Sequence, residues 1–262
     1  MSYIEFENVS FGYPSGKGHE EIIRNFSLKI EKGEFLVLIG QSGCGKSTLL
    51  SLLEGLMLPG QGRITIEGKT VTGPSLQKSV IFQHDSLFPW MTVEKNVRFG
   101  IRQARRGISR NDEKKLAQQA LVQVGMEKDG NKYPGELSGG MQQRTAIART
   151  LAMDSEIFLM DEPFGAVDPR RRRLLQELLV SLWQKKKAEG TSKTIVFVTH
   201  DIDEAVFLAD RIVYLRKNGG FEELAVPLPR PRNAGELTGS QCFCSFRKKL
   251  VELFEEEGGV LE

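Results

Sequence analysis

The chain has 262 residues, and its 36 lysines and arginines nearly balance its 34 acidic residues, which gives a net charge of +2 at pH 7. This length allows one large domain, or one domain with a subdomain. The balanced charge gives no support to a general nucleic-acid-binding role. The basic runs at 170–173 and 185–187 are typical of solvated helix faces.

Three cysteines, Cys44, Cys242 and Cys244, match neither a disulfide framework nor a common zinc spacing, which favours a reducing cytoplasm. No signal peptide is visible, and no apolar stretch approaches the length of a membrane span. The most apolar stretch, 49–58, predicts a core helix. We therefore expect a soluble chain that associates with a membrane only through a partner.

Strands and helices are predicted from hydrophobic periodicity and from turn residues. The first part is rich in strands, the region from about 85 to 150 contains only helices, and an α/β alternation then returns. A proline-punctuated segment at 227–232 precedes a short charged helix. The predicted strands are 3–9, 22–30, 35–39, 63–66, 80–82, 157–160, 194–198 and 211–215. A helix begins after residue 47, and further helices are predicted at 93–101, 111–124, 139–153, 169–189, 202–209 and 246–257.

Residues 40–47 match the phosphate-binding pattern G-x-x-x-x-G-K-[ST], between an apolar strand and the start of a helix. Glycines let backbone N–H groups converge on phosphate oxygens, and a helix N-terminus adds positive potential. Lys46 is expected to reach the β- and γ-phosphates, and the Ser47 hydroxyl to hold Mg²⁺. The predicted nucleotide-binding segment is Gly40, Gln41, Ser42, Gly43, Cys44, Gly45, Lys46, Ser47 and Thr48.

Two acidic residues and a histidine follow predicted strands later in the chain. Asp161 comes after four apolar residues, where a carboxylate can orient Mg²⁺, and Glu162 is placed to polarise the attacking water as a general base. His200 follows the strand at 194–198. The carboxyl ends of strands are where open parallel sheets bind ligands.

Several stretches occur in a characteristic order: LSGGMQQR at 137–144, DEP at 161–163, GAVD at 165–168 and VTHD at 198–201. Together with the phosphate-binding loop, this set resembles the ATP-binding cassette (ABC) ATPase family over about residues 3–232. The resemblance implies an α/β fold, with a P-loop NTPase core, an antiparallel β subdomain and an inserted helical subdomain at about 85–150. It also implies an ATP-binding domain at 1–232, followed by a short helical tail at 233–262.

The resemblance also implies roles for single residues. Gln83 would sense Mg²⁺ and the attacking water, and so would be a catalytic and metal-site residue. His200 would hydrogen-bond the γ-phosphate. Tyr13 would stack on adenine, with Phe11 as the alternative.

The same family places ATP between two copies of the cassette. Ser138, Gly139 and Gly140 open a helix and would contact ATP held by the second copy, while Asp168 would communicate across the interface. We therefore expect a two-fold homodimer that uses ATP and Mg²⁺, closes on ATP binding and opens after hydrolysis.

A finer resemblance, to importer ATPases of the nitrate/sulfonate/taurine group, comes from the stretches at 88–93, 160–166, 199–205 and 228–232. It implies permease partners, an indirect link to a solute-binding protein, and a place at the cytoplasmic face of the inner membrane, with no nucleic acid. The alternatives are an exporter or lipid-extraction cassette, and a soluble ABC ATPase acting on nucleic acid or ribosomes. The apolar segment at 87–91 is either a buried staple for the next helix or a groove for a permease helix.

Overall fold

The computed structural model describes residues 2–15, 18–82, 87–165, 167–232, 237 and 239–257. It divides the chain into two compact units. Unit 1 combines Met1–Ser75 with Trp183–Glu262, and unit 2 is Leu76–Leu182. Strands and helices occur in both, which confirms the predicted α/β class.

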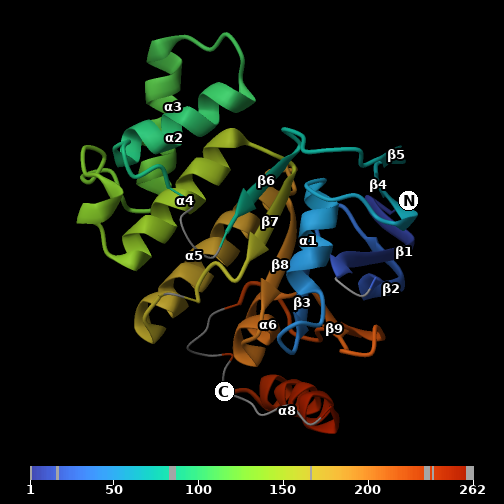
Figure 1. The fold of residues 1–262 in the computed structure, drawn as a ribbon. Helices are drawn as coiled ribbons and strands as arrows, with labels where there is room; N and C mark the ends of the chain where they lie inside the picture. The colour runs from blue at the N-terminus through green and yellow to red at the C-terminus, as the bar shows by residue number, and fades with distance from the viewer. Residues whose placement is uncertain are drawn as a thin grey trace. The chain divides into compact units, whose positions relative to one another are not determined.

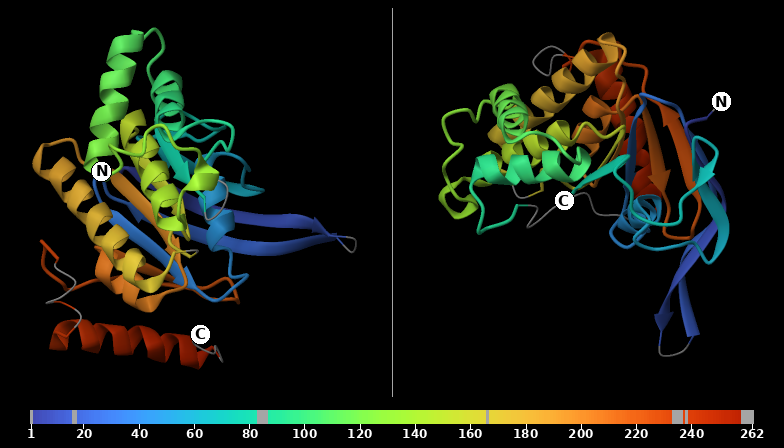
Figure 2. Two further views of the ribbon diagram at one scale, coloured as in Figure 1. Left: turned by 90° about the vertical axis from the view of Figure 1, so that its left-hand side faces the viewer. Right: turned by 90° about the horizontal axis from the view of Figure 1, so that it is seen from above.

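Unit 1 contains a four-stranded sheet in which every described strand pair is antiparallel. The first strand is longer than the sequence predicts, because its pairing with the second continues to Ser15↔Gly18, whereas its pairing with β4 ends at Ser10↔Gln61. The hairpin of β1 and β2 therefore extends beyond the other strands of this sheet (Figure 2). The sheet order is β2-β1-β4-β5, with β1 at Ile4–Ser15, β2 at Gly18–Ile30, β4 at Gln61–Ile66 and β5 at Lys69–Thr70.

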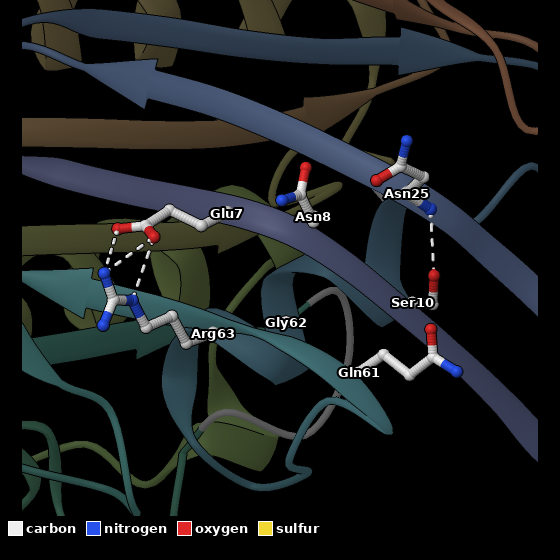
Figure 3. Close-up of a pocket in the computed structure, with 7 residues that line it drawn as sticks. All are labelled: Glu7, Asn8, Ser10, Asn25, Gln61, Gly62 and Arg63. Atoms are coloured by element: carbon white, nitrogen blue, oxygen red, sulfur yellow. Dashed lines mark hydrogen bonds and ion pairs between the residues drawn. The ribbon is translucent and has the colours of Figure 1, made fainter.

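A polar hollow lies on this sheet, where bulges interrupt the pairing of β1 with its neighbours (Figure 3). Arg63 donates two hydrogen bonds to the Glu7 carboxylate, at 2.9 and 3.2 Å, and the Asn25 backbone N–H donates to Ser10 Oγ at 2.9 Å. Four of the residues that line the hollow thus bind one another in two pairs. The residues that line the hollow are Glu7, Asn8, Ser10, Asn25, Gln61, Gly62 and Arg63. None of them belongs to the predicted nucleotide site.

The core of unit 1 is formed by strands in the order β10-β9-β3-β8. Strand β3 pairs in parallel with both β8 and β9, and β10 is antiparallel to β9. Every residue of β3 and β8 is buried, as expected for parallel strands that are covered on both faces. The bounds are Phe35–Gly40 for β3, Thr194–Thr199 for β8, Arg211–Leu215 for β9 and Phe221–Ala225 for β10, of which the sequence did not predict β10.

Helices α1 (Lys46–Glu54), α6 (Ile202–Leu208) and α8 (Gln241–Glu256) lie wholly in unit 1. The predicted core helix over 49–58 is wrong at its end, because Gly55 adopts a left-handed conformation (φ 85°) and closes α1. Helix α8 begins five residues before the predicted start at 246, because Ser240 caps its first turn by accepting from Phe243 N–H at 3.2 Å. It packs against α6 (Figure 1).

The proline-punctuated segment after β10 is fixed by two arginines. The Arg232 side chain is 7% exposed and donates to the carbonyls of Phe207 and Ala209, at 2.8 and 2.7 Å, at the C-terminus of α6. A cation there meets the negative end of the helix dipole. Burial lowers the pKa of Arg232 to about 10, so it is still charged at neutral pH. Arg230 instead pairs with Asp210 at 2.8 Å.

Unit 2 combines two parallel strands with a group of helices. Strand β6 ends at Ile81, one residue before the predicted end, and Phe82 is 46% exposed. Helix α2 packs against α3 and α4, and between residues 87 and 150 the structure places helices and turns but no strand, as the sequence predicts. The bounds are β6 Lys78–Ile81, α2 Val93–Ala104, α3 Arg110–Gln123, η1 Pro134–Glu136, α4 Gly139–Met153, β7 Ile157–Asp161 and α5 Pro169–Ala188, whose last residues from Trp183 belong to unit 1.

Buried polar groups hold the helices of unit 2 together. Arg98 and Arg102 donate to the Glu113 carboxylate at 2.7 and 2.9 Å, which ties α2 to α3. Asn96 is fully buried and binds both backbone groups of Phe88, at 2.8 and 3.1 Å. Among the helices that the structure describes, none combines the length and the hydropathy of a membrane span.

Candidate nucleotide site

The phosphate-binding loop lies between β3 and α1, as the sequence predicts. Gly43 and Gly45 have φ values of 81° and 99°, a region that residues with a side chain rarely adopt. Gly45 is also the N-cap of α1, and within the described part of the chain no side chain caps this helix start. This helix start carries the positive end of the helix dipole, which attracts anions.

Lys46 folds back over the loop from the first turn of α1. Its side chain is 7% exposed, and its ammonium donates to the carbonyls of Gly40 at 2.8 Å and Gln41 at 2.9 Å. Ser47, the next residue, is exposed. The lysine thus adds a positive charge at the helix end that already attracts anions.

Gly40 is enclosed by its neighbours at the start of the loop. A Cβ atom at this position would lie 2.4 Å from the Leu215 carbonyl oxygen and 2.8 Å from Cys44 Sγ. Cys44 is 6% exposed, and burial raises the pKa of its thiol, which stays neutral at pH 7. The first glycine of the pattern is therefore required by the close approach of the last residue of β9.

His200 lies at the same edge of the sheet as the loop. Ile39 pairs with Thr199 in the β3–β8 register, so Gly40 and His200 follow adjacent strand ends. The Thr199 hydroxyl donates to the Glu204 carboxylate and accepts from Asp201 N–H at 3.0 Å. Thr199 and Glu204, which fix the chain on either side of Asp201, were not predicted as site residues. The spacing Asp201-x-x-Glu204, which is that of a helix-capping box, could have indicated them.

Tyr13 is also brought to this region of unit 1. Its hydroxyl lies 3.3 Å from Thr48 Oγ1, and its ring packs edge-on against Phe11 with the centroids 5.1 Å apart. Tyr13 is 41% exposed, whereas Phe11 is half-buried. Its exposed ring and its contact with α1 fit the stacking role, which stays a prediction.

The acidic pair lies in unit 2. Asp161 is the last residue of β7, directly after Met160, which pairs with Ile81 of β6. Glu162 has φ 44°, a left-handed conformation that costs a residue with a side chain about 1 kcal/mol or more. Such backbone strain concentrates at functional sites. Gln83 lies outside the described residues.

The signature residues open α4, also in unit 2. Ser138 is the N-cap in an extended conformation, and α4 starts at Gly139. A Cβ on Gly140 would lie 3.4 Å from the Arg171 side chain, so the helix start packs closely against the beginning of α5. Asp168 accepts from Arg171 N–H at 3.1 Å and caps α5. Asp168 thus has a structural role as a helix cap. Its role across a dimer interface stays a prediction.

A glycine loop with left-handed backbone, a helix N-terminus that begins in this loop and a lysine folded over the loop together define a P-loop nucleotide-binding protein. The family model described as "ABC transporter" matches residues 23–165, and the chain belongs to this family. It is therefore an ATPase of the ABC type.

Curated relatives span nearly the whole chain. It is 42% identical to an uncharacterized ABC transporter ATP-binding protein of Methanocaldococcus jannaschii, over 97% of this chain and 92% of the relative. It is 40% identical to the aliphatic sulfonates import ATP-binding protein SsuB of Bacillus cereus, over 99% and 98% of the two chains. It is 39% identical to the nitrate import ATP-binding protein NrtC of a Synechocystis strain over 98% of this chain, but it spans only 38% of that relative's length.

A solved structure supports the same assignment. The ATP-binding cassette MJ0796, in a dimeric post-hydrolysis state bound to ADP and Pi, is 32% identical to this chain. The comparison covers 86% of this chain and all of that one, with a TM-score of 0.74.

Proposed function

We propose that this chain is the ATP-hydrolysing subunit of an ABC importer that takes up a small solute of the nitrate or sulfonate kind. The observation that carries the proposal is the joint position of the phosphate-binding loop and His200 at one edge of the unit 1 sheet. Relatives named for nitrate and sulfonate import support the transport direction, and they favour neither the exporter nor the nucleic-acid alternative.

The loop residues would bind the phosphates of ATP. The N–H groups at the start of α1 would hold phosphate oxygens, and Lys46 would exchange its contacts with Gly40 and Gln41 for the β- and γ-phosphates. His200 would hydrogen-bond the γ-phosphate, and Tyr13 would stack on adenine.

The side chains available for a magnesium ion suit that metal. Ser47 offers an exposed hydroxyl beside Lys46, and Asp161 offers a half-buried carboxylate at a strand end. Mg²⁺ prefers such oxygen ligands and keeps several waters. Ser47, Asp161 and Gln83 would hold it, and when bound it would neutralise phosphate charge.

Glu162 would act as the general base. Its position directly after Asp161, together with its strained backbone, supports a catalytic role for the carboxylate. It would accept a proton from the water that attacks the γ-phosphate.

Two copies of the chain would form the working unit, with Ser138, Gly139, Gly140 and Asp168 facing the second copy. The dimeric cassette among the similar structures supports this arrangement. The pair would dock on permease subunits at the cytoplasmic face of the membrane, and a solute-binding protein would deliver the solute. Trp90, which is 70% exposed while Leu87 is buried, is a candidate permease contact.

Glu162→Gln tests the assignment. The amide keeps the size of the side chain but cannot accept the proton, so ATP turnover should fall at least about a hundredfold while the affinity for ATP stays within a few-fold. Phosphate release and nucleotide titration measure the two quantities. The matched control, Glu127→Gln on an exposed loop of unit 2, should leave both unchanged. Undiminished turnover in Glu162→Gln would remove Glu162 from the mechanism.

A further inference from the structure

Strand β9 joins the phosphate-binding loop to the C-terminal helix. In the parallel register, Tyr214 of β9 pairs with Ile39, and Leu215 pairs with Gly40, the first residue of the loop. The Leu215 carbonyl is so close to Gly40 that it leaves no room for a Cβ there. A displacement of the end of β9 therefore displaces the start of the loop.

The C-terminal helix binds this strand through the Tyr214 side chain. Tyr214 is fully buried, and its single hydroxyl proton is shared between two acceptors, the Leu253 carbonyl at 3.1 Å and Glu257 Oε2 at 2.9 Å. Its ring packs edge-on against Phe254, with the centroids 5.0 Å apart. A buried phenol with both acceptors on α8 and its C-cap fixes the last turn of that helix against β9.

The Glu257 carboxylate also acts on a thiol of the loop. Burial raises the pKa of Cys44, the Lys46 ammonium lowers it, and the Glu257 carboxylate raises it to a smaller extent. Burial and the Glu257 carboxylate likewise raise the pKa of Tyr214, and Cys44 adds to that effect. The phenol therefore stays protonated and keeps donating across the whole neutral range.

We propose that α8 is a positioning element for the phosphate-binding loop, and that Tyr214, through Leu253 and Glu257, holds the end of β9 against Gly40 in the conformation that binds ATP. The proposal rests on the proposed function, since it assumes that ATP occupies the loop. Tyr214 is a positioning residue and does not itself touch the nucleotide.

The expected effect follows from population arithmetic. When the hydrogen bond of Tyr214 is lost, a smaller fraction of molecules holds the loop in the binding conformation, and the apparent affinity falls by that fraction. Since only part of the energy of the phenol's hydrogen bonds acts on the loop conformation, we expect a change of about three- to tenfold. The KM for ATP should rise by this factor, while kcat stays within about twofold, because the proposed base belongs to the other unit.

The experiment compares, in the full chain, substitutions at the contact between Tyr214 and the end of α8 with a control substitution elsewhere on that helix. Tyr214→Phe keeps the ring and removes the hydroxyl, and Glu257→Ala removes one acceptor. The control, Arg247→Ala, breaks the exposed ion pair with Asp203 of α6, which leaves the docking of α8 on Tyr214 intact. The Kd for ATP, the KM, kcat and the melting temperature without nucleotide are measured for each variant.

The expected result is a three- to tenfold rise in Kd for Tyr214→Phe and Glu257→Ala, with Arg247→Ala unchanged. Glu257→Gln separates the hydrogen bond from the charge, because it keeps a carbonyl acceptor and should bind ATP at least as tightly as the wild type. The idea is overturned if Kd stays within twofold in Tyr214→Phe and Glu257→Ala, even where the melting temperature falls. It is also overturned if Glu257→Ala binds ATP more tightly, as loss of a nearby negative charge alone would cause. Failure of the wild type to bind ATP would contradict the proposed function instead.

Discussion

Two buried cations of unit 1 and a buried carboxylate of unit 2 are held in different ways. In unit 1, Arg232 donates to backbone carbonyls at the end of α6, and Lys46 donates to carbonyls of its own loop. In unit 2, Glu113 is held by two arginine side chains that are 23% and 60% exposed. Backbone carbonyls do not titrate, whereas a carboxylate does. We therefore expect mild acid to leave the contacts of Lys46 and Arg232 in unit 1 unchanged. The contact between α2 and α3 in unit 2 should weaken, because it depends on the Glu113 carboxylate.

The largest effect is expected in unit 1, where backbone atoms determine the shape of the phosphate-binding loop. Gly40→Ala places a Cβ 2.4 Å from the Leu215 carbonyl oxygen and 2.8 Å from the sulfur of the buried Cys44, so the backbone of β9 or the loop must shift. We expect ATP affinity to fall more than about tenfold, and the free energy of unfolding to fall by about 1–3 kcal/mol. Nucleotide titration and urea denaturation measure these changes. In the control Gly73→Ala, the added Cβ meets open space, and both quantities should stay near those of the wild type.

A smaller effect is expected in unit 2. The hydrogen bond from Arg102, followed by that from Arg98, lowers the pKa of Glu113 below its ordinary value of 4.5. Glu113 therefore contributes stability that is present above about pH 4.5 and is lost as the pH falls through its lowered value. Glu113→Gln should cost about 1–2 kcal/mol at pH 7, because both arginines remain partly solvated. This cost should shrink on acidification, as measured by urea denaturation from pH 7 to 3.

The matched variant for this test is Arg232→Met in unit 1. It leaves carbonyls of α6 without their donor, so it should destabilise the chain by a similar amount over the whole of that pH range. An acid-dependent cost for Arg232→Met, or a constant cost for Glu113→Gln, would contradict the contrast between the units.

The nucleotide loop could be predicted from sequence because its chemistry is local. Residues 40–47 contain the glycines, the lysine and the hydroxyl that a phosphate requires, and apolar runs on either side indicate a strand and a helix. Strand β9 and helix α4 begin and end where the sequence predicts, since turn residues and caps mark both ends.

Features that depend on distant residues could not be predicted. The extension of β1 to Ser15 requires pairing with β2, and β10 requires pairing with β9, neither of which a local pattern reports. The burial of Arg232 could not be predicted, because the proline-punctuated segment at 227–232 gives no local sign of its contact with α6. The contact of Tyr214 with Glu257 joins residues 43 positions apart, so no local sequence motif predicts it.

The most direct test of the central claim is the mass of the Glu162→Gln chain in solution, measured by light scattering with ATP and with ADP. An ABC-type ATPase that cannot hydrolyse ATP should accumulate as the closed pair, so the account predicts a doubling of mass with ATP and Mg²⁺ and the mass of one chain with ADP. A single-chain mass at ATP concentrations where titration shows the site to be saturated would contradict the account.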